Sequence, residues 1–216
     1  RSITENAREL VARLDEDARA RCQWKSGPSV LALSGGLDSR SIACSLSRTN
    51  CSFEATTFAR PKGRNASDVE YAKKIAACFA LSHDVISLPP RSPRHLRDLL
   101  RAKGGLNPFD VSYMIPYLET LSKRYVDGAH LLTGNGGALL RDLQPTQPIA
   151  NHDKLLQALF EKAWLNPERA ARLVGVRPER LLSSIRERLA TYPECSLRGQ
   201  YIHFAFERLF KYSFEG

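Results

Sequence analysis

The chain has 216 residues, of which 43% are hydrophobic and 25% charged, so it can bury a core and is not a disordered tail. Its apolar runs are too short for a membrane-spanning helix and its N-terminus lacks a signal-peptide pattern, so we expect a cytoplasmic protein with no membrane partner. The 32 Lys and Arg against 23 Asp and Glu give a formal charge of +9, which favours an anionic partner such as a nucleotide, a polyphosphate or RNA.

The chain begins with the pattern of a helix, a strand and a second helix. Residues 2–24 start with a Ser-x-x-Glu capping box and carry apolar residues at helical spacing, which predicts an amphipathic helix. The run Val30–Leu33 is apolar on both faces, as in a strand that is buried in a parallel sheet. After a glycine turn, residues 39–48 predict a helix with one apolar side.

Strands and helices continue to alternate up to about residue 150. Strands are predicted at 53–58, 83–88 and 129–133, and helices at 68–79, 92–102 and 114–125. Such alternation implies βαβ units, so we expect an α/β fold with an open parallel sheet and helices on both faces. Sheets of this type bind ligands at the carboxyl ends of their strands.

The strand signal disappears from residue 151 onward. Helices are predicted at 152–164, 167–174, 178–190 and 197–212. We therefore divide the chain into an α/β domain at 1–150 and a helical C-terminal region at 151–216.

The cysteines and histidines show no metal-binding spacing. The five cysteines are an odd number without a C-x-x-C pair, which predicts reduced and mostly buried thiols. They are Cys22, Cys44, Cys51, Cys78 and Cys195.

The most informative segment is Ser34-Gly35-Gly36-Leu37-Asp38-Ser39, between the first buried strand and its helix. Two adjacent glycines let the backbone present its N–H groups inward, and the following helix adds the partial positive charge of its N-terminus. The loop can therefore hold phosphates, with the Ser34 and Ser39 hydroxyls as further donors. Asp38 beside a phosphate implies a bridging Mg²⁺. A glycine turn with Asp38 merely capping the helix is the alternative interpretation.

This loop lacks the Gly-Lys-Ser/Thr ending of the P-loop of kinases and GTPases. It resembles instead the signature of the PP-loop ATP pyrophosphatases, whose fold is the adenine nucleotide α-hydrolase type. The resemblance implies that ATP is cleaved between its α- and β-phosphates. In that superfamily the loop holds pyrophosphate and AMP is passed to a substrate oxygen.

Two further segments resemble the asparagine synthetase branch, which includes β-lactam synthetases and lasso-peptide cyclases. Residues 67–76 look like the branch's acidic helix with a Tyr-Ala pair, and residues 131–137, Leu-Leu-Thr-Gly-Asn-Gly-Gly, look like its second motif. The resemblance implies an ATP-dependent ligase that forms an amide bond through an acyl-adenylate, as in asparagine biosynthesis. Its substrate would be a small-molecule or peptide carboxylate.

The resemblance also implies roles for individual residues. Leu33 and the segment from Phe58 to Arg60 would contact the adenine through their backbone, and Thr133 and Gly134 would approach the ribose and the α-phosphate. The phosphate-binding residues would be Ser34, Gly35, Gly36, Asp38 and Ser39, and Asp38 would be the metal ligand.

The sequence departs from the family pattern after Gly134. Asn135 stands where the branch has a catalytic Glu or Tyr, and it cannot act as a base at neutral pH. Ala138 and Leu139 replace a metal-binding Asp and a Glu. The later Glu, the Pro-Phe-Leu-Asp segment, the catalytic Lys and the N-terminal glutaminase domain of the branch have no counterpart, so we expect a truncated chain or an excerpt, with a glutaminase domain as a partner in the same or another chain.

Two other functions stay open at this point. One is a degenerate module that binds the nucleotide without catalysis. The other is a tRNA-modifying PP-loop enzyme, which the positive charge favours and the missing C-x-x-C pair disfavours. A basic helix face could meet RNA, although a solvated surface is the simpler interpretation; it carries Arg91, Arg94, Arg97 and Arg101.

Overall fold

A computed structural model gives the structure of the chain. It describes residues 2–23, 27–103, 109–135, 145, 147–163 and 166–209. Contacts within the chain divide it into two compact units, residues 1–137 and residues 138–216.

A parallel sheet forms the centre of the first unit. Its strands are β1 (Ser29–Ala32), β2 (Glu54–Ala59), β3 (His83–Ser87) and β4 (His130–Thr133), and within the described residues their order is β3-β2-β1-β4. All three strand pairs are parallel, and Leu31 pairs with Ala55 on one side and with Leu132 on the other. The predicted open parallel sheet is therefore confirmed.

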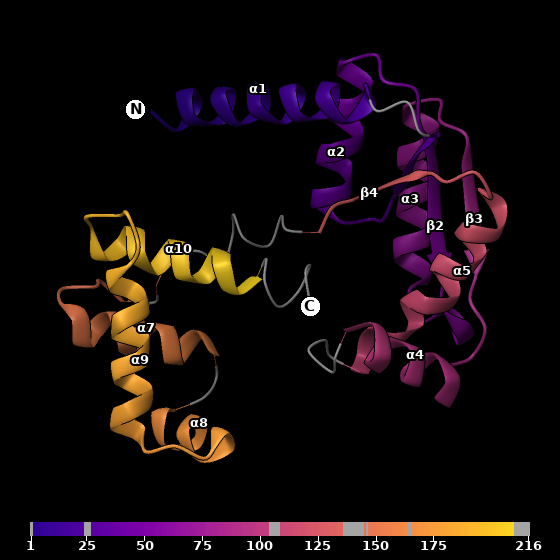
Figure 1. Ribbon diagram of the computed structural model, residues 1–216. Helices are drawn as coiled ribbons and strands as arrows, with labels where there is room; N and C mark the ends of the chain where they lie inside the picture. The colour runs from indigo at the N-terminus through magenta and orange to yellow at the C-terminus, as the bar shows by residue number, and fades with distance from the viewer. Residues whose placement is uncertain are drawn as a thin grey trace. The chain divides into compact units, whose positions relative to one another are not determined.

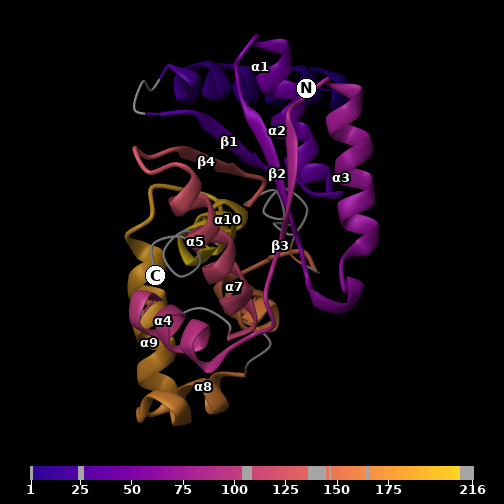
Figure 2. The same ribbon diagram turned by 90° about the vertical axis from the view of Figure 1, so that its right-hand side faces the viewer.

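Helices cover both faces of this sheet. Because successive residues of a strand point to opposite faces, Leu31 and Val30 belong to different cores. Leu31 packs among side chains from α1 (Ile3–Cys22), α2 (Leu37–Arg48) and α3 (Ala66–Cys78), whereas Val30 packs with Tyr117 and Leu121 of α5 (Met114–Arg124). Figure 2 shows α2 and α3 on one side of the strands and α5 on the other. The predicted two-sided coverage is confirmed.

The N-terminal helix α1 contacts the rest of the first unit through its C-terminal half. Ser2 caps it with the predicted capping box, in which Ser2 Oγ accepts from the Glu5 N–H and the Glu5 carboxylate accepts from the Ser2 N–H. The first half extends away from the sheet, and Ile3 is 90% exposed (Figure 1). In the second half the Asp15 carboxylate accepts hydrogen bonds from Ser45 Oγ at 2.6 Å and from the Arg48 guanidinium at 2.7 Å. These bonds fix α1 to α2.

The strand order creates a switch point beside β1. The chain proceeds from β1 to β2 and β3 on one side, whereas β4 pairs with the opposite edge of β1. In open α/β sheets a ligand crevice forms where the strand order reverses, at the carboxyl ends of the two strands. Here Ala32 at the end of β1 pairs with Thr133 at the end of β4. The first motif begins two residues after Ala32, and the second motif, residues 131–137, includes Thr133, so the two motifs meet at this edge of the sheet.

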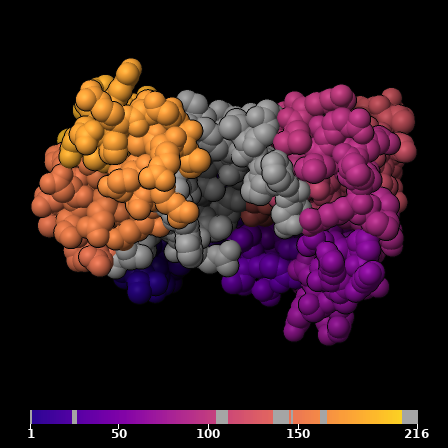
Figure 3. All heavy atoms as spheres, turned by 90° about the horizontal axis from the view of Figure 1, so that it is seen from below, coloured from indigo at the N-terminus to yellow at the C-terminus, as the bar shows by residue number. Residues whose placement is uncertain are grey.

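Within its described residues, the second unit consists of helices and the segments that connect them, without a strand. It contains α7 (His152–Ala163), α8 (Pro167–Val174), α9 (Pro178–Ala190) and α10 (Leu197–Leu209). Leu155, Leu159, Leu189 and Tyr201 form its core, and Figure 3 shows the atoms of this unit in orange and yellow. The predicted helical C-terminal region is confirmed.

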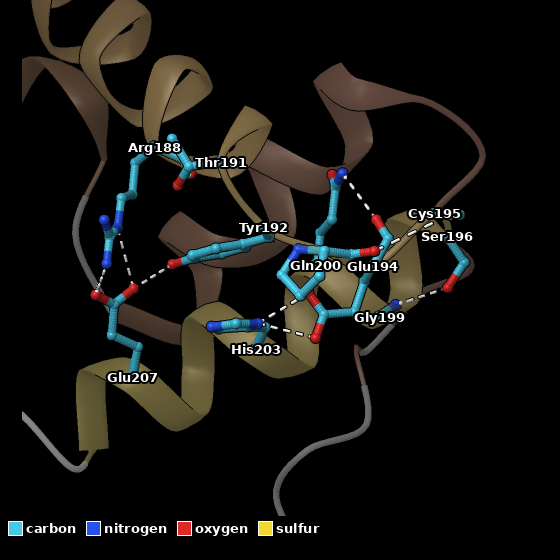
Figure 4. Close-up of polar contacts among 11 residues, drawn as sticks. Arg188, Thr191, Tyr192, Glu194, Cys195, Ser196, Gly199, Gln200, His203 and Glu207 are labelled. Carbon is cyan, nitrogen blue, oxygen red and sulfur yellow. Dashed lines mark hydrogen bonds and ion pairs between the residues drawn. The ribbon is translucent and has the colours of Figure 1, made fainter.

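A polar cluster joins the end of α9 to α10 (Figure 4). The Tyr192 ring stacks on the His203 ring with centroids 3.9 Å apart, and the Tyr192 hydroxyl donates to the Glu207 carboxylate. Glu207 also pairs with Arg188, and His203 Nδ1 lies 2.8 Å from the Glu194 carboxylate. The cluster therefore fixes the connection between the two helices through side chains as well as through the apolar core.

The cysteine prediction needs a correction. The structure contains free cysteines as expected, but none of them is fully buried: Cys22, Cys44 and Cys51 are half-buried, and Cys78 and Cys195 are exposed. Cys78 is the last residue of α3, on the side away from the sheet core. Burial and the neighbouring Cys51 raise the pKa of Cys22 to about 12, so this thiol stays protonated at neutral pH.

Candidate functional site

The glycine loop that follows β1 is held by its own serine side chains. Ser39 Oγ accepts from the Ser34 N–H at 3.1 Å and lies 3.0 Å from Ser34 Oγ, which in turn accepts from the Gly36 N–H at 3.1 Å. The side chain of Ser39 is buried, because the residue itself is only 3% exposed. The two hydroxyls that sequence analysis assigned to phosphates therefore also organise the loop that carries them.

The first glycine of the loop is required by close packing. Sequence reasoning attributes Gly35 and Gly36 to a sharp backbone turn, but neither has a positive φ angle, and the φ of Gly36 is −74°. A β-carbon added to Gly35 would lie 2.9 Å from Asp68 Oδ1 and 3.0 Å from the Tyr71 β-carbon. The Gly35 N–H donates to the same Asp68 Oδ1 at 2.6 Å. Helix α3 thus lies directly against the start of the loop.

The N-terminus of α2 opens onto this loop. The helix begins at Leu37, two residues earlier than predicted, so Asp38 and Ser39 lie in its first turn. Its N-cap is Gly36, which has no side chain to accept hydrogen bonds from the first helical amides. Asp38 is therefore not the N-cap residue. Arg40, also in the first turn, donates from Nε to the Gly36 carbonyl at 3.3 Å.

The second motif comes into contact with the first at Gly134. A β-carbon added to Gly134 would lie 2.5 Å from the Ser39 amide nitrogen and 2.9 Å from the Asp38 carbonyl carbon. The backbone after β4 is therefore in contact with the first turn of α2, and only glycine permits this approach. Asn135 follows in an exposed turn, where its N–H donates to Thr133 Oγ1 at 3.4 Å. The remaining residues of this motif and the two departures that follow it, Gly136, Gly137, Ala138 and Leu139, lie outside the described residues.

The predicted adenine-binding segment at the end of β2 is bonded to an asparagine. Asn65 Nδ2 donates to the Phe58 carbonyl and Asn65 Oδ1 accepts from the Arg60 N–H, each at 2.8 Å. The Arg60 guanidinium lies over the ring of Tyr113, 4.7 Å from its centroid, and the Phe58 and Tyr113 rings are 5.1 Å apart. Asn65 thus fixes the backbone at the two positions that sequence analysis assigned to the adenine.

Leu33, the other predicted adenine contact, joins β1 to β2. Its N–H donates to the Thr56 carbonyl at 2.8 Å, and its carbonyl accepts from Thr57 Oγ1 at 2.7 Å. Thr57 Oγ1 also lies 2.8 Å from His83 Nε2. Burial lowers the pKa of His83, which favours the neutral imidazole. Because the Thr57 hydroxyl donates its hydrogen to the Leu33 carbonyl, it is an acceptor for the Nε2–H tautomer of His83. The Leu33 backbone is consequently held in place by the neighbouring strand.

The residues of the site fit Mg²⁺ only in combination with phosphate oxygens. Asp38 is the carboxylate within the loop, and the described residues contain no group of three or more His, Cys, Asp or Glu that could hold a metal ion. Mg²⁺ commonly uses one or two carboxylates together with substrate phosphates and water. Asp38 beside a phosphate cradle matches this donor set, whereas a site made of protein ligands alone would not.

Sequence reasoning missed the contribution of α3 and of the segment before it. Asn65 and Asp68 both hydrogen-bond to backbone groups of predicted site residues, and Tyr113 packs on Arg60. Asp68 and Gly35 are 33 positions apart in the sequence, so no local spacing predicts their contact. The signal in the sequence was the resemblance of residues 67–76 to the acidic helix of the branch, from which no contact with the loop was inferred.

A parallel sheet with a glycine-rich loop at its switch point and a second loop packed against it defines an α/β protein with a candidate ligand site at the carboxyl ends of its strands. The chain belongs to the asparagine synthase family, whose model matches residues 10–141 and so includes both loops. This membership supports an ATP-dependent activity of the ligase type. A search of curated proteins finds no significant match.

Two solved structures are similar to this chain at low identity. One is the NH3-dependent NAD synthetase from Campylobacter jejuni, in complex with the nitrate ion, at 17% identity and a TM-score of 0.43 over 94% of this chain and 95% of that chain. The other is NMN synthetase from Francisella tularensis, at 14% identity and a TM-score of 0.40 over 98% of this chain and 95% of that one. At these scores neither likeness bears on the reaction of this chain.

Among the described residues, no helix is both long enough and apolar enough to cross a membrane.

Proposed function

We propose that the chain binds ATP at the switch point and uses it to form an amide bond. The observation that carries this proposal is the contact between the two motifs, in which Gly134 lies against the backbone of Asp38 and Ser39. Two glycine-containing loops in contact beside a helix N-terminus are suited to a nucleotide whose phosphates need backbone N–H donors and close backbone approach.

In the proposed arrangement each predicted residue has one role. The loop from Ser34 to Ser39 holds the β- and γ-phosphates, and Thr133 and Gly134 lie beside the ribose and the α-phosphate. Leu33 and the Phe58–Arg60 segment form the adenine side of the site. Asp38 would hold Mg²⁺, which neutralises charge on the pyrophosphate leaving group.

The proposed reaction has two steps. A substrate carboxylate oxygen attacks the α-phosphorus, the bond to the bridging oxygen of the pyrophosphate breaks, and pyrophosphate leaves to give an acyl-adenylate. An amine then attacks the acyl carbon, AMP leaves, and the amine loses a proton to give the amide. In the first step the chain's own residues hold the leaving pyrophosphate and orient the α-phosphate.

A second function is favoured by one residue. Asn135 stands at the position of the family's catalytic Glu or Tyr, and a carboxamide cannot accept a proton at neutral pH. A chain with this substitution could bind ATP and Mg²⁺ and make no acyl-adenylate. The two proposals therefore share the nucleotide site and differ in turnover.

The test combines a binding and an exchange measurement on the same protein. Calorimetric titration measures the affinity of the site for ATP in the presence of Mg²⁺. Carboxylate-dependent exchange of labelled pyrophosphate into ATP measures the rate of the first chemical step. We expect Asp38→Asn to abolish Mg²⁺-dependent ATP affinity and Asp17→Asn, on the exposed side of α1, to leave it unchanged. Binding without exchange for every carboxylate tested would support the non-catalytic module, and absence of binding would overturn both.

A further inference from the structure

The start of α3 makes one direct contact with the glycine loop. Asp68 lies in the first turn of α3, and its Oδ1 accepts from the Gly35 N–H at 2.6 Å. A hydrogen bond from a backbone N–H to a carboxylate is shorter and stronger than one between neutral groups. Gly35 is the first glycine after β1, so this bond acts where the loop leaves the strand.

Packing reinforces the same contact. A β-carbon at Gly35 would lie 2.9 Å from Asp68 Oδ1, 3.0 Å from the Tyr71 β-carbon and 3.4 Å from the Asp68 α-carbon. The helix backbone therefore lies close to the loop on the side where the carboxylate bonds to it. Gly35 is held by a hydrogen bond and by van der Waals contact with the same helical turn.

Another carboxylate of α3 provides an internal comparison. Glu70 lies two residues after Asp68, is 67% exposed in its side chain, and pairs with Lys74 one turn further along the helix. It shares the charge and the helix of Asp68, and in the part of the chain that the structure describes its ion pair is with Lys74 and not with the loop. If substitution of Asp68 changes ligand affinity and substitution of Glu70 does not, the effect comes from the bond to Gly35 and not from negative charge at this end of α3.

A phosphate cradle works only if its donors are already in place. Glycine has more backbone conformations than any other residue, so a loop with two adjacent glycines loses the most entropy when it becomes ordered on a ligand. A bond that fixes Gly35 before binding removes part of that cost. It also keeps Ser34 Oγ where it accepts from the Gly36 N–H.

We propose that Asp68 is a positioning residue for the glycine loop, which acts through the Gly35 N–H and does not itself contact the phosphates. This proposal rests on the proposed function, because it assigns the loop to pyrophosphate. Two other roles are conceivable for the Asp68 carboxylate. If it competed with the ligand, Asp68 would have to release the Gly35 N–H before an anion could bind there. If it were a metal ligand, Asp68 would supply a second carboxylate beside Asp38.

The substitution of Asp68 by Asn separates the three roles. The Asn side-chain oxygen still accepts from the Gly35 N–H, but the side chain has lost its charge and is a poor Mg²⁺ ligand. Positioning therefore predicts that Asp68→Asn retains affinity, competition predicts tighter binding, and metal ligation predicts a loss that is confined to titrations with Mg²⁺.

The experiment is calorimetric titration of the full chain with sodium pyrophosphate, with and without Mg²⁺. We expect Asp68→Ala to weaken pyrophosphate binding about tenfold in both conditions, the scale of a lost hydrogen bond to a charged group. Asp68→Asn should stay within about threefold of the wild type. The matched controls Glu70→Ala and Glu70→Gln should bind as the wild type does.

A further variant protects the test against misfolding of Asp68→Ala. Asp68→Glu keeps the charge and moves the carboxylate by one methylene into a space that is already tight, so positioning predicts severalfold weaker binding. Wild-type affinity in Asp68→Glu or in a folded Asp68→Ala would overturn the proposal, as would tighter binding in Asp68→Asn. If the wild type and both Glu70 variants fail to bind pyrophosphate, both the proposed function and this inference are overturned.

Discussion

Gly134 lies against Ser39, so that a β-carbon added to the glycine would stand 2.5 Å from the serine amide nitrogen. The atoms that it would meet are backbone atoms in the first turn of α2, which cannot rotate away as a side chain would. This contact joins the end of β4 to the loop that follows β1 and defines the candidate site.

Substitution of Gly134 by Ala should separate the two loops. The added methyl group forces β4 or α2 to shift, so we expect the free energy of unfolding to fall by about 1–3 kcal/mol, as in other overpacked sites. Urea unfolding followed by circular dichroism measures this change.

The matched control is Gly36→Ala in the neighbouring loop. Among the described residues, a β-carbon there comes near Ser34 Oγ alone, at 3.2 Å, and the φ angle of −74° suits alanine. We expect a change within about 1 kcal/mol, because alanine also restricts the unfolded chain. If the two variants lowered the free energy of unfolding equally, the close contact at Gly134 would not be the cause of the destabilisation.

Ser39 offers a second comparison within a single helix. Ser39→Ala removes the hydroxyl that contacts the Ser34 N–H and Ser34 Oγ, so the loop loses its internal order. We expect the affinity for ATP and Mg²⁺ to fall about tenfold, measured by calorimetry.

Ser41→Ala changes the same group two residues further along α2. The Ser41 hydroxyl is exposed and donates to the Leu37 carbonyl at 2.9 Å, a bond within the helix. Alanine is the better helix former, so ATP affinity should stay at the wild-type value. A loss of affinity in both variants would indicate that helix α2 as a whole, and not the Ser39 hydroxyl, controls the loop.

The strand and the glycine loop of the first motif were accessible to sequence reasoning because local patterns determine them. A short run that is apolar on both faces, Val30–Leu33, predicts a central strand, and a glycine turn before a helix predicts the βα loop. The second motif, residues 131–137, was found instead through its resemblance to the asparagine synthetase branch. The strand order that brings Thr133 beside Ala32 needs the pairing of distant segments, which no local pattern contains.

The contacts of α3 could not be predicted for a related reason. Asp68 and Asn65 have the ordinary properties of polar residues at a helix start, where Asp and Asn are common for purely local reasons. Their bonds to Gly35 and Arg60 depend on how α3 packs on the sheet. The start of α2 at Leu37 also could not be predicted, because Leu, Asp and Ser are equally compatible with a loop and with a first helical turn.

The bond between Asp15 and α2 should make the protein sensitive to acid. The hydrogen bonds from Arg48 and Ser45 lower the pKa of Asp15 to about 2, from 3.8. A carboxylate with a lowered pKa stabilises the folded state above its unfolded pKa, and this contribution is lost as the pH falls through the folded value. We therefore expect the wild type to lose stability between about pH 4 and pH 2.

Asp15→Asn should remove that part of the pH dependence and lower the thermal midpoint at pH 7. The control is Asp17→Asn, because Asp17 pairs with Arg21 on the exposed face of the same helix, where ion pairs contribute little. Thermal unfolding at a series of pH values from 7 to 2 measures both variants. If the two curves coincide, the connection between α1 and α2 does not contribute to stability.

The polar cluster of the helical unit predicts the opposite behaviour in alkali. Burial, together with the carboxylate of Glu207, raises the pKa of Tyr192 to about 12, from 10.0. A tyrosine with a raised pKa stabilises the folded state fully below its unfolded pKa, and that stability is lost as the pH rises through the folded value. The wild type should therefore lose stability between about pH 10 and pH 12.

Tyr192→Phe isolates this contribution, because it keeps the ring that stacks on His203 and removes only the hydroxyl. At pH 8 we expect a loss of about 0.5–1.5 kcal/mol, the net value of one hydrogen bond, and a shallower decline in alkali than that of the wild type. Tyr71→Phe is the control, since the Tyr71 side chain is exposed on α3. An unchanged alkaline decline in Tyr192→Phe would assign the titration to other tyrosines, of which Tyr117 and Tyr125 also have raised pKa values through burial.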